Sequence, residues 1–161
     1  LNLRKDKVLL ENGRTSWREV VEHKGAAAVV AVDEEDKLLL VRQYRYALGR
    51  ELLEIPAGKL DHEGEDPQSA AVRELREETG AVPDILMPLG VILPSPGCYG
   101  EHLHLFLARE LKMGQQQPDE DEFLRLERIP FQEMVHRIMN GEIEDAKTVA
   151  AVLKAKVLLD L

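Results

Sequence analysis

The sequence predicts a mixed α/β fold of the α+β kind, in which helices pack against a mixed β-sheet. Three observations predict it. Many short apolar runs are separated by turn residues, a few longer stretches carry helix start and stop signals, and residues 25–32 are apolar at nearly every position. The chain has 161 residues, of which 44% are hydrophobic, so we expect one domain with a buried core.

The N-terminal residues predict a β-hairpin. Residues 7–11 (KVLLE) and 16–22 (SWREVVE) are expected to be strands, because Asn12-Gly13 between two apolar runs is a strong turn signal. A two-stranded hairpin alone is only marginally stable in water, so its apolar side needs a partner surface. We therefore expect residues 1–22 to be the dimerisation element of a homodimer, and residues 23–161 to form the main domain.

Three more strands are expected before the first helix. Residues 25–32 (GAAAVVAV) and 37–42 (KLLLVR) lie on either side of the acidic turn DEED. The first of these strands has so few polar positions that we expect it to be buried on both faces of the sheet. Residues 50–56 (RELLEIP) form a third, short strand that leads into Ala57-Gly58 and a polar loop.

The first helix is predicted from Pro67 to Thr79. Asp66 is a good N-cap, and proline suits the first helical position because its missing N–H would be unpaired there anyway. Gly80 follows the last helical residue and can adopt the left-handed conformation that commonly ends a helix.

The C-terminal half predicts three strands and two helices. The strands are expected over residues 84–93, 102–109 and 123–128, with a polar segment at residues 112–120. Pro130 is expected to start a helix that ends near Gly141, and Asp145 to cap a last helix that runs to about Leu159. The core candidates of this last helix are Ala150, Ala151, Leu153 and Val157.

Composition and charge exclude several classes of protein. The chain carries 21 Lys and Arg against 30 Asp and Glu, and a net charge of -9 argues against a partner held by its phosphate backbone, such as a nucleic acid. The longest strictly apolar run is far shorter than the ~18 residues that a membrane span needs. One cysteine excludes an internal disulfide, and the first residues lack the apolar core of a signal peptide. A cytoplasmic protein is expected.

The predicted helix 67–79 carries an acidic face. Glu74, Glu77 and Glu78 have the spacings that place side chains on one side of a helix, where like charges repel. A bound divalent cation would reverse this repulsion, and carboxylate oxygens around an open site suit Mg²⁺ or Mn²⁺. The alternative is an ordinary solvated face, in which Arg73 and Arg76 neutralise the glutamates.

The segment from Gly58 to Ala81 resembles the Nudix box of the Nudix hydrolases. That motif reads G-x5-E-x7-R-E-U-x-E-E-x-G-U, in which U is an apolar residue. Every fixed position from Glu65 onward matches, whereas six residues instead of five separate Gly58 from Glu65. A loop accepts such an insertion. The resemblance implies a Nudix α/β/α sandwich with a mixed β-sheet and a catalytic loop-helix-loop, preceded here by the N-terminal hairpin.

The resemblance also implies roles for individual residues. Glu74 and Glu78 would be the principal metal ligands, and Glu77 a further ligand or a catalytic group that reaches the metals through water. The carbonyl group of Ala57 commonly adds a ligand, and the cofactor would be Mg²⁺, with Mn²⁺ possible. The motif positions expected to be structural are Gly58, Glu65, Arg73 and Gly80.

Further segments are similar to the ADP-ribose pyrophosphatase branch of the family. They are the lead-in from Tyr44 to Asp61, Pro96 at 16 residues beyond Gly80, and residues 141–148. This similarity implies hydrolysis of the pyrophosphate bond of ADP-ribose or a related ADP-sugar, with AMP and ribose 5-phosphate as the products from ADP-ribose. The alternatives are another nucleoside diphosphate derivative as substrate, or a non-catalytic nucleotide-binding Nudix module.

A general base is expected in the acidic segment 118–122 (PDEDE). Comparison with this branch favours Glu120 as the base and Glu122 as a metal ligand or supporting residue. A carboxylate on a loop can accept the proton of the attacking water. The alternative is an ordinary acidic surface loop.

The substrate is expected to be a small nucleotide sugar. Arg45 is the candidate that binds its pyrophosphate, because arginine suits bidentate phosphate contacts; Arg42 and Arg50 are weaker options. Tyr44 and Trp17 are candidates to stack on adenine, although core or dimer packing is an alternative for Trp17. Glu101 is a candidate to hydrogen-bond the ribose or the terminal phosphate.

Overall fold

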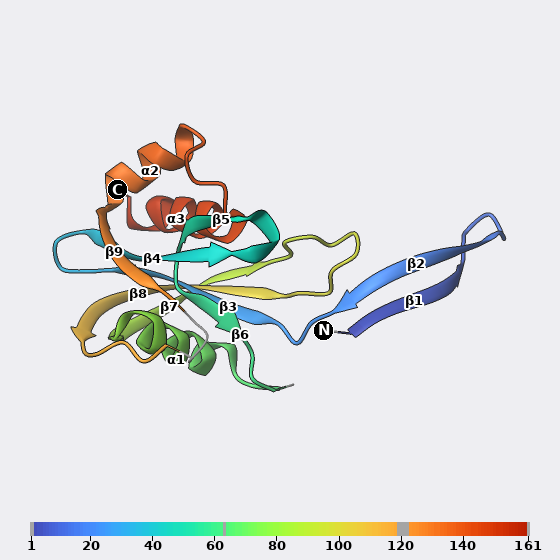
Figure 1. The fold of residues 1–161 in the computed structure, drawn as a ribbon, viewed down its shortest axis with the longest axis horizontal. Helices are drawn as coiled ribbons and strands as arrows, with labels where there is room; N and C mark the ends of the chain where they lie inside the picture. The colour runs from blue at the N-terminus through green and yellow to red at the C-terminus, as the bar shows by residue number, and fades with distance from the viewer. Residues whose placement is uncertain (1, 63, 119–122, 161) are drawn as a thin grey trace.

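The computed structural model describes residues 2–62, 64–118 and 123–160. Figure 1 shows a layered body in which helices lie on both sides of a β-sheet, with a long hairpin extending from one end. The expected mixed sheet packed by helices is confirmed. None of the described helices is long and apolar enough to cross a membrane.

The sheet of the body contains seven strands among the described residues. Its main order is β5-β4-β3-β8-β7, and β6 pairs with β3 while β9 pairs with β4. The pairing of β3 with β8 is parallel and the other pairings are antiparallel, so the sheet is mixed. The strands are β3 (Ala26–Val32), β4 (Lys37–Arg45), β5 (Arg50–Glu54), β6 (Ala57–Lys59), β7 (Ala81–Ile92), β8 (Leu103–Met113) and β9 (Arg125–Pro130).

Strand β3 is the centre of the sheet, and every one of its residues is buried. Because side chains alternate along a strand, Ala28 and Val30 belong to one core layer while Ala27 and Val29 belong to the other. The first layer also includes residues of the two C-terminal helices, and the second includes residues of the first helix. The prediction of a strand buried on both faces is confirmed.

Helix α1 (Pro67–Thr79) has the predicted bounds. The Asp66 side chain accepts a hydrogen bond from the Ser69 N–H at 3.0 Å, and Gly80 ends the helix with φ at 77°. A Cβ atom at Gly80 would also clash with the carbonyl oxygen of Gly114. Glycine is therefore required at this position by conformation and by space.

Helices α2 (Phe131–Met139) and α3 (Ala146–Leu159) cover the opposite face of the sheet (Figure 1). Among the core candidates of the last helix, Ala151 is fully buried, and Ala150 and Leu153 pack at the edge of the core. Val157 was predicted to be in the core, and this prediction is wrong, because its exposed fraction is 83%. The buried face of α3 is instead completed by Ala155.

Several strands differ in extent from the prediction. β6, a strand of three residues, was not expected; it forms because its backbone pairs with β3. β7 begins directly after Gly80 and includes Pro83 and Pro88, which an edge strand tolerates. A short 3-10 helix (Tyr46–Leu48) joins β4 to β5.

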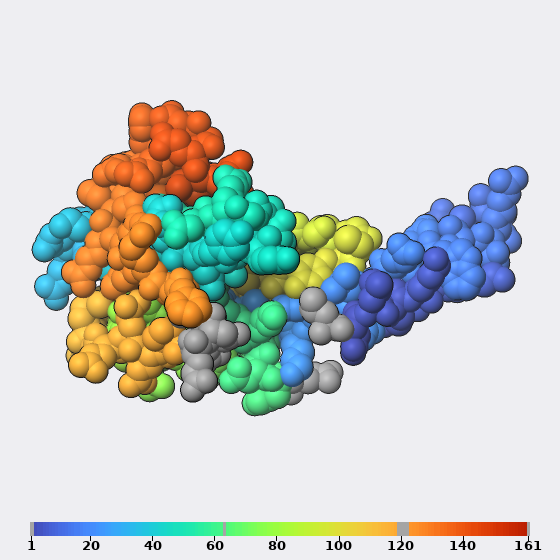
Figure 2. All heavy atoms as spheres, in the orientation of Figure 1, coloured from blue at the N-terminus to red at the C-terminus, as the bar shows by residue number. Residues whose placement is uncertain are grey.

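The N-terminal hairpin consists of β1 (Asn2–Leu9) and β2 (Thr15–Glu22), which pair with each other and with none of the strands of the body sheet. Figure 2 shows it as an arm that extends away from the body. Its base is attached to a loop of the body, because Val21 N–H donates to the Cys98 carbonyl at 2.8 Å and Gly100 N–H donates to the Val21 carbonyl at 3.0 Å.

Candidate active site

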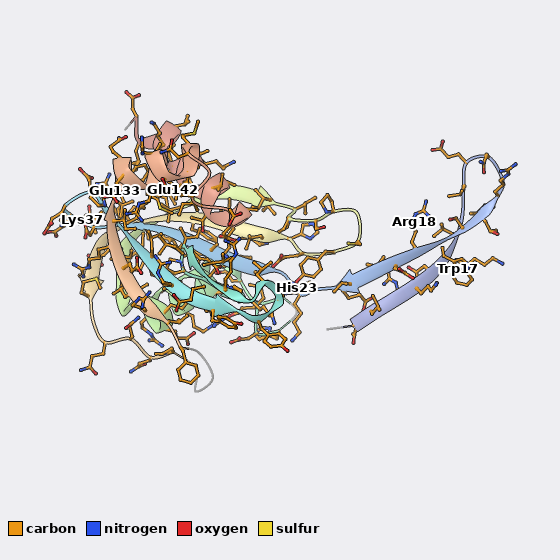
Figure 3. All side chains as sticks on the ribbon, turned by 45° about the horizontal axis from the view of Figure 1, so that its top comes forward. Trp17, Arg18, His23, Lys37, Glu133 and Glu142 are labelled. Atoms are coloured by element: carbon orange, nitrogen blue, oxygen red, sulfur yellow. The ribbon has the colours of Figure 1, made fainter. Side chains whose placement is uncertain are left out.

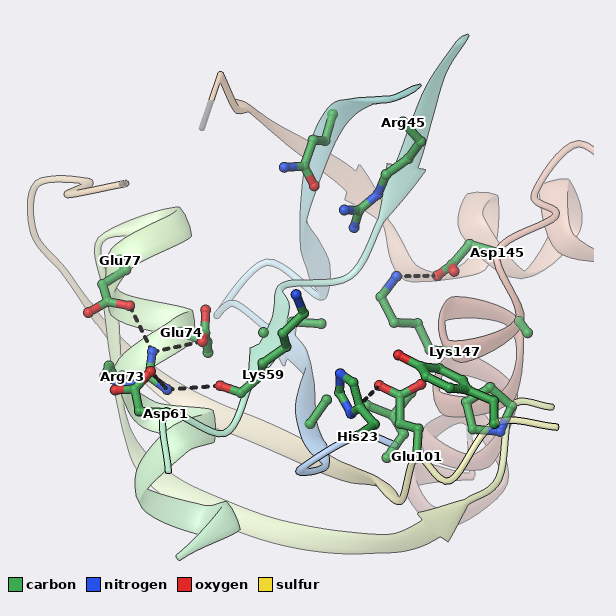
Figure 4. Close-up of a pocket in the computed structure, with 18 residues that line it drawn as sticks. His23, Arg45, Lys59, Asp61, Arg73, Glu74, Glu77, Glu101, Asp145 and Lys147 are labelled. Atoms are coloured by element: carbon green, nitrogen blue, oxygen red, sulfur yellow. Dashed lines mark hydrogen bonds and ion pairs between the residues drawn. The ribbon is translucent and has the colours of Figure 1, made fainter. Parts of the chain in front are cut away.

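A cavity of about 700 Å³ opens between α1, β6 and the first turn of α3 (Figure 4). Its volume lies within the ~300–1,000 Å³ that small-molecule sites commonly have. Charged and polar side chains dominate its lining. The lining residues that matter for the chemistry are His23, Gln43, Arg45, Ala57, Gly58, Lys59, Asp61, Arg73, Glu74, Glu77, Tyr99, Glu101, Asp145 and Lys147.

One wall of the pocket is the acidic face of α1. Arg73 lies between two of the glutamates, since its Nη1 donates to Glu74 Oε1 at 2.7 Å and to Glu77 Oε2 at 3.2 Å. Burial lowers the pKa of Arg73, but the hydrogen bond and the charge of Glu74 outweigh it and raise that pKa above the ordinary arginine value. Arg73 therefore stays charged and reduces the repulsion among the carboxylates.

Gly58 lies directly against the carboxylate of Glu74. A Cβ atom at this position would collide with all three atoms of the carboxyl group. β6, which carries Gly58, pairs with β3, and α1, which carries Glu74, packs against the same strand. The two residues are therefore brought together by β3. The missing side chain of Gly58 is thus what lets the Glu74 carboxylate approach the backbone of β6.

Glu78 is buried, with an exposed fraction of 3%. Its Oε2 accepts a hydrogen bond from the Ala57 N–H at 3.0 Å, which fixes the carboxylate beside the start of β6. The carbonyl groups at the end of α1 hold the segment that follows β8: Gln117 N–H donates to the Glu77 carbonyl at 2.9 Å, and the Gln116 side chain donates to the Glu78 carbonyl. That segment is therefore attached to the C-terminal end of α1.

The loop between β6 and α1 is held by Glu65 and Arg73. Glu65 Oε2 accepts from the Asp61 N–H at 2.6 Å, and Arg73 Nη2 donates to the Lys59 carbonyl at 3.2 Å. Arg73 also lies 3.4 Å from Asp61 and 3.6 Å from Glu65. Through these contacts Glu65 and Arg73 stabilise the conformation of the loop between β6 and α1.

The opposite wall contains two cations, Arg45 and Lys147, which share one buried carboxylate. Glu54 is 1% exposed, and Arg45 binds it bidentately, with Nε at 2.7 Å and Nη2 at 2.8 Å from its two oxygens. Lys147, in the first turn of α3, forms an ion pair with the same carboxylate and with Asp145 at 3.1 Å. Burial raises the pKa of Glu54, but Arg45 and Lys147 together lower it below the ordinary value, so Glu54 stays ionised.

A third wall is formed by His23, Tyr99 and Glu101. The His23 ring packs edge-on against Tyr99 with ring centroids 5.2 Å apart, and its Nδ1 lies 3.7 Å from Glu101 Oε1. The Gly25 N–H donates to the same Nδ1 at 3.1 Å. Burial, and then the charge of Glu101, raise the pKa of Tyr99, so its phenol stays protonated.

The structure brings seven predicted site residues to the lining of the pocket. Glu65, Glu78 and Gly80 belong to the adjoining loop and helix but do not line it, and three further predicted residues lie apart from it. The residues that line the pocket as expected are Arg45, Ala57, Gly58, Arg73, Glu74, Glu77 and Glu101. Tyr44 and Pro96 are not among the lining residues and are exposed. Trp17 lies out on the hairpin, whereas His23 lies at the junction with the body (Figure 3). Glu120 and Glu122 lie outside the described residues.

Seven of these lining side chains were not predicted as site residues by the sequence analysis, namely His23, Gln43, Lys59, Asp61, Tyr99, Asp145 and Lys147. For Lys147 a signal existed, because a cation in the first turn of a helix opposes the helix dipole and needs another partner. Glu54 carried a weaker signal, since it lies between Leu53 and Ile55 and a charge that is buried must be paired. No local pattern marks His23, Lys59 or Tyr99.

Within residues 2–62, 64–118 and 123–160, no three His, Cys, Asp or Glu side chains are close enough to enclose a metal ion by themselves. Glu74 and Glu77 both bind Arg73, and Glu78 binds the Ala57 N–H. The acidic face is therefore arranged around an arginine and a backbone donor.

Comparison with known proteins gives consistent results. The NUDIX domain matches residues 22–152. An ADP-ribose pyrophosphatase of Bacillus subtilis (strain 168) is 41% identical over 154 residues, covering 94% of this chain and 83% of that protein. A methanol dehydrogenase activator of Bacillus methanolicus is 44% identical with the same coverage. A solved structure of an ADP compounds hydrolase superposes with a TM-score of 0.85 at 25% identity, covering 98% of this chain and 85% of that one. The family match and these relatives agree with the fold and with the acidic helix, and the chain belongs to the NUDIX domain family.

Proposed function

We propose that this Nudix pyrophosphohydrolase splits the pyrophosphate bond of ADP-ribose, or a related ADP-sugar, and gives AMP and ribose 5-phosphate from ADP-ribose. One observation carries the proposal: the acidic face of α1 and the cations Arg45 and Lys147 lie on opposite sides of one pocket (Figure 4). A diphosphate fits between them, because metal ions at the glutamates and the cations opposite would share its negative charge. Relatives named for ADP-ribose hydrolysis support this choice of substrate.

The residues fit a divalent cation, and we infer that it is Mg²⁺. Nudix ADP-ribose pyrophosphatases use divalent metal ions, and carboxylate and carbonyl oxygens are the ligands that Mg²⁺ prefers. Glu74 and Glu78 would hold it together with the Ala57 carbonyl, and Glu77 would contribute directly or through water. The space left by Gly58 keeps the Glu74 carboxylate at the backbone. When bound, the metal polarises phosphoryl oxygens and lowers the pKa of a bound water.

The other roles in the proposed reaction, phosphate binding and proton transfer, belong to side chains of the protein. Arg45 binds a phosphate oxygen with the part of its guanidinium group that faces the pocket, while Glu54 fixes its orientation. Glu120 accepts the proton of the attacking water, and Glu122 supports the metal. Their segment follows Gln117 in the sequence, and the Gln117 N–H is bonded to the last turn of α1, the helix that carries the three glutamates.

Replacement of Gly58 by alanine tests the metal site. The added Cβ would push away the Glu74 carboxylate, so we expect the Mg²⁺ concentration for half-maximal turnover to rise about 10–100-fold, as for other residues that support metal ligands. Gly97→Ala is the matched control, because a Cβ there meets open space. Metal titrations of both variants measure the effect, and an unchanged requirement in Gly58→Ala would contradict it.

We also propose that the chain is a homodimer in which a second copy covers the hairpin. The register places Leu3 opposite Val21, and Trp17 opposite Lys7, on one face of the hairpin. Leu3 and Leu9 on this face are 75% and 74% exposed, and Trp17 is 56% exposed. In a dimer, Trp17 would reach the partner's site and stack on adenine, because it lies out on the hairpin and does not line the pocket of its own chain (Figure 3).

Light scattering is expected to give about twice the mass of 18.2 kDa for the chain at micromolar concentration. Leu9→Asp should produce monomers, because it replaces one of the exposed apolar side chains of this face by a charge. Val8→Asp, on the opposite face of the hairpin, is the control and should remain dimeric. A fully active monomer of the unchanged chain would refute the dimer.

A substrate panel tests the proposed activity. The panel consists of ADP-ribose, ADP-glucose, GDP-mannose and a nucleoside triphosphate, each with Mg²⁺ and with EDTA. We expect the highest kcat/KM for ADP-ribose and no turnover in EDTA. A preference for GDP-mannose or for the triphosphate would identify that compound as the substrate in place of ADP-ribose. Binding of these compounds without turnover of any of them would favour a non-catalytic module.

A further inference from the structure

Two cations on one wall of the pocket share a single buried carboxylate. Arg45 and Lys147 come from β4 and α3, which are far apart in the sequence, and both form ion pairs with Glu54. Glu54 is 1% exposed and ionised, so its charge can be balanced only by groups that reach it in the interior. The carboxylate thereby holds the two cationic side chains next to each other.

In this arrangement Arg45 and Lys147 can still present N–H donors to the pocket. Arg45 uses Nε and Nη2 for Glu54, so Nη1 is not engaged in that pair. Its side chain is 41% exposed, and both Arg45 and Lys147 line the cavity. An ammonium group has three N–H donors, and Lys147 forms ion pairs with Glu54 and Asp145.

The carboxylate of Asp145 forms an ion pair with Lys147, so Glu54 and Asp145 together balance the charges of the two cations, and this wall offers N–H donors rather than a net positive charge. Asp145 caps α3 and accepts hydrogen bonds from the N–H and the hydroxyl group of Thr148. Its negative charge therefore faces the positive end of the helix dipole. The Thr148 hydroxyl in turn accepts from the Ile55 N–H at 3.0 Å, which fixes the first turn of α3 to the chain segment that follows Glu54.

We propose that Lys147 is a further substrate-binding residue, which holds a phosphate oxygen of the substrate's diphosphate together with Arg45. The proposal rests on the proposed function only in that the substrate carries a diphosphate. The ammonium group lies across the pocket from Glu74 and Glu77, so the diphosphate would be bound on one side by the acidic helix and its metal and on the other by two fixed cations (Figure 4). Glu54 sets the positions of both cations and does not touch the substrate.

Binding of inorganic pyrophosphate to EDTA-treated protein tests this role without the metal and without turnover. By isothermal titration calorimetry, Lys147→Met should weaken binding about 10–100-fold, the usual effect of losing one hydrogen bond to a charged group. Lys147→Arg should restore most of the affinity. Lys112→Met is the matched control: it removes an exposed lysine that pairs with Asp84 on β7, and it should bind as the unchanged chain does.

Kinetics and thermal melting separate substrate binding from a structural role. Lys147→Met should raise KM for ADP-ribose by a similar factor and leave kcat within a few-fold, because the contact exists before and during the reaction. Its melting temperature should stay close to that of the unchanged chain, since Arg45 still binds Glu54 through two hydrogen bonds.

Three results would overturn the proposal. They are unchanged pyrophosphate binding in Lys147→Met, no pyrophosphate binding by the unchanged chain, and an equal loss in Lys147→Met and Lys147→Arg with a lower melting temperature in both. Ribose 5-phosphate binding that depends on Lys147 as strongly as pyrophosphate binding would assign the contact to a product monophosphate instead. If ADP-ribose is not hydrolysed but pyrophosphate binding depends on Lys147, the proposed substrate fails while the anion site stands.

Discussion

Replacing Glu78 by glutamine is expected to lower kcat for ADP-ribose by about 10³-fold or more, because the metal supplies several kcal/mol of charge stabilisation in the transition state. Glu78 is the most buried of the three glutamates on the acidic face, and its carboxylate is fixed by the Ala57 N–H. The amide oxygen of glutamine can still accept that hydrogen bond. The fold should therefore survive, and less negative charge beside Glu74 should keep the metal-free protein as stable as before.

The measurement is turnover at saturating Mg²⁺ together with thermal melting in EDTA. Glu133→Gln is the matched control, because it makes the same change on α2, far from the pocket, where Glu133 pairs with Arg137. Turnover of Glu78→Gln within tenfold of the unchanged chain would count against Glu78 as a metal ligand. A large drop in melting temperature would show instead that Glu78 has a structural role.

Replacing Glu120 by glutamine is expected to lower kcat by about 10²–10⁴-fold with little change in KM, the usual loss on removal of a general base. The box glutamates would be bound to cations and poorly basic, so the proton must go to another carboxylate. The segment that carries Glu120 follows Gln117, whose N–H is bonded to the Glu77 carbonyl.

Glu122→Gln separates the two candidate bases. A large loss in Glu122→Gln alone would make Glu122 the base and Glu120 a supporting residue. If each variant keeps its turnover, the base lies outside this segment. Rescue of the Glu120 variant at high pH is a further check, because hydroxide in solution can replace a missing general base more readily than a missing metal ligand.

The parts of the fold that the sequence predicted best are those with local signals. The bounds of α1 follow from Asp66, Pro67 and Gly80, each of which acts on the helix end next to it. β3 was predicted to be buried on both faces because it has no polar position. β6 was missed because three residues carry no periodicity, and only pairing with β3 makes them a strand. Val157 was misplaced because the packing of α3, not its composition, decides which face is buried.

The candidate site likewise contains residues that local patterns predict and residues that only the fold brings together. Glu74 and Glu77 were predicted because helical spacing alone places them on one face with Glu78. Lys147 and Tyr99 come from segments distant in the sequence, and only the fold brings them to the same pocket. Trp17 shows the opposite case, since its residue type suggested adenine stacking while the hairpin carries it away from the pocket of its own chain (Figure 3).

The most direct test of the proposed reaction is a ³¹P NMR time course of ADP-ribose with the purified chain and Mg²⁺. The two diphosphate resonances should disappear together and be replaced by two phosphomonoester resonances that match AMP and ribose 5-phosphate, with no change in EDTA. Persistent diphosphate resonances under these conditions, or the appearance of ADP or inorganic phosphate as the first product, would contradict hydrolysis at the pyrophosphate bond.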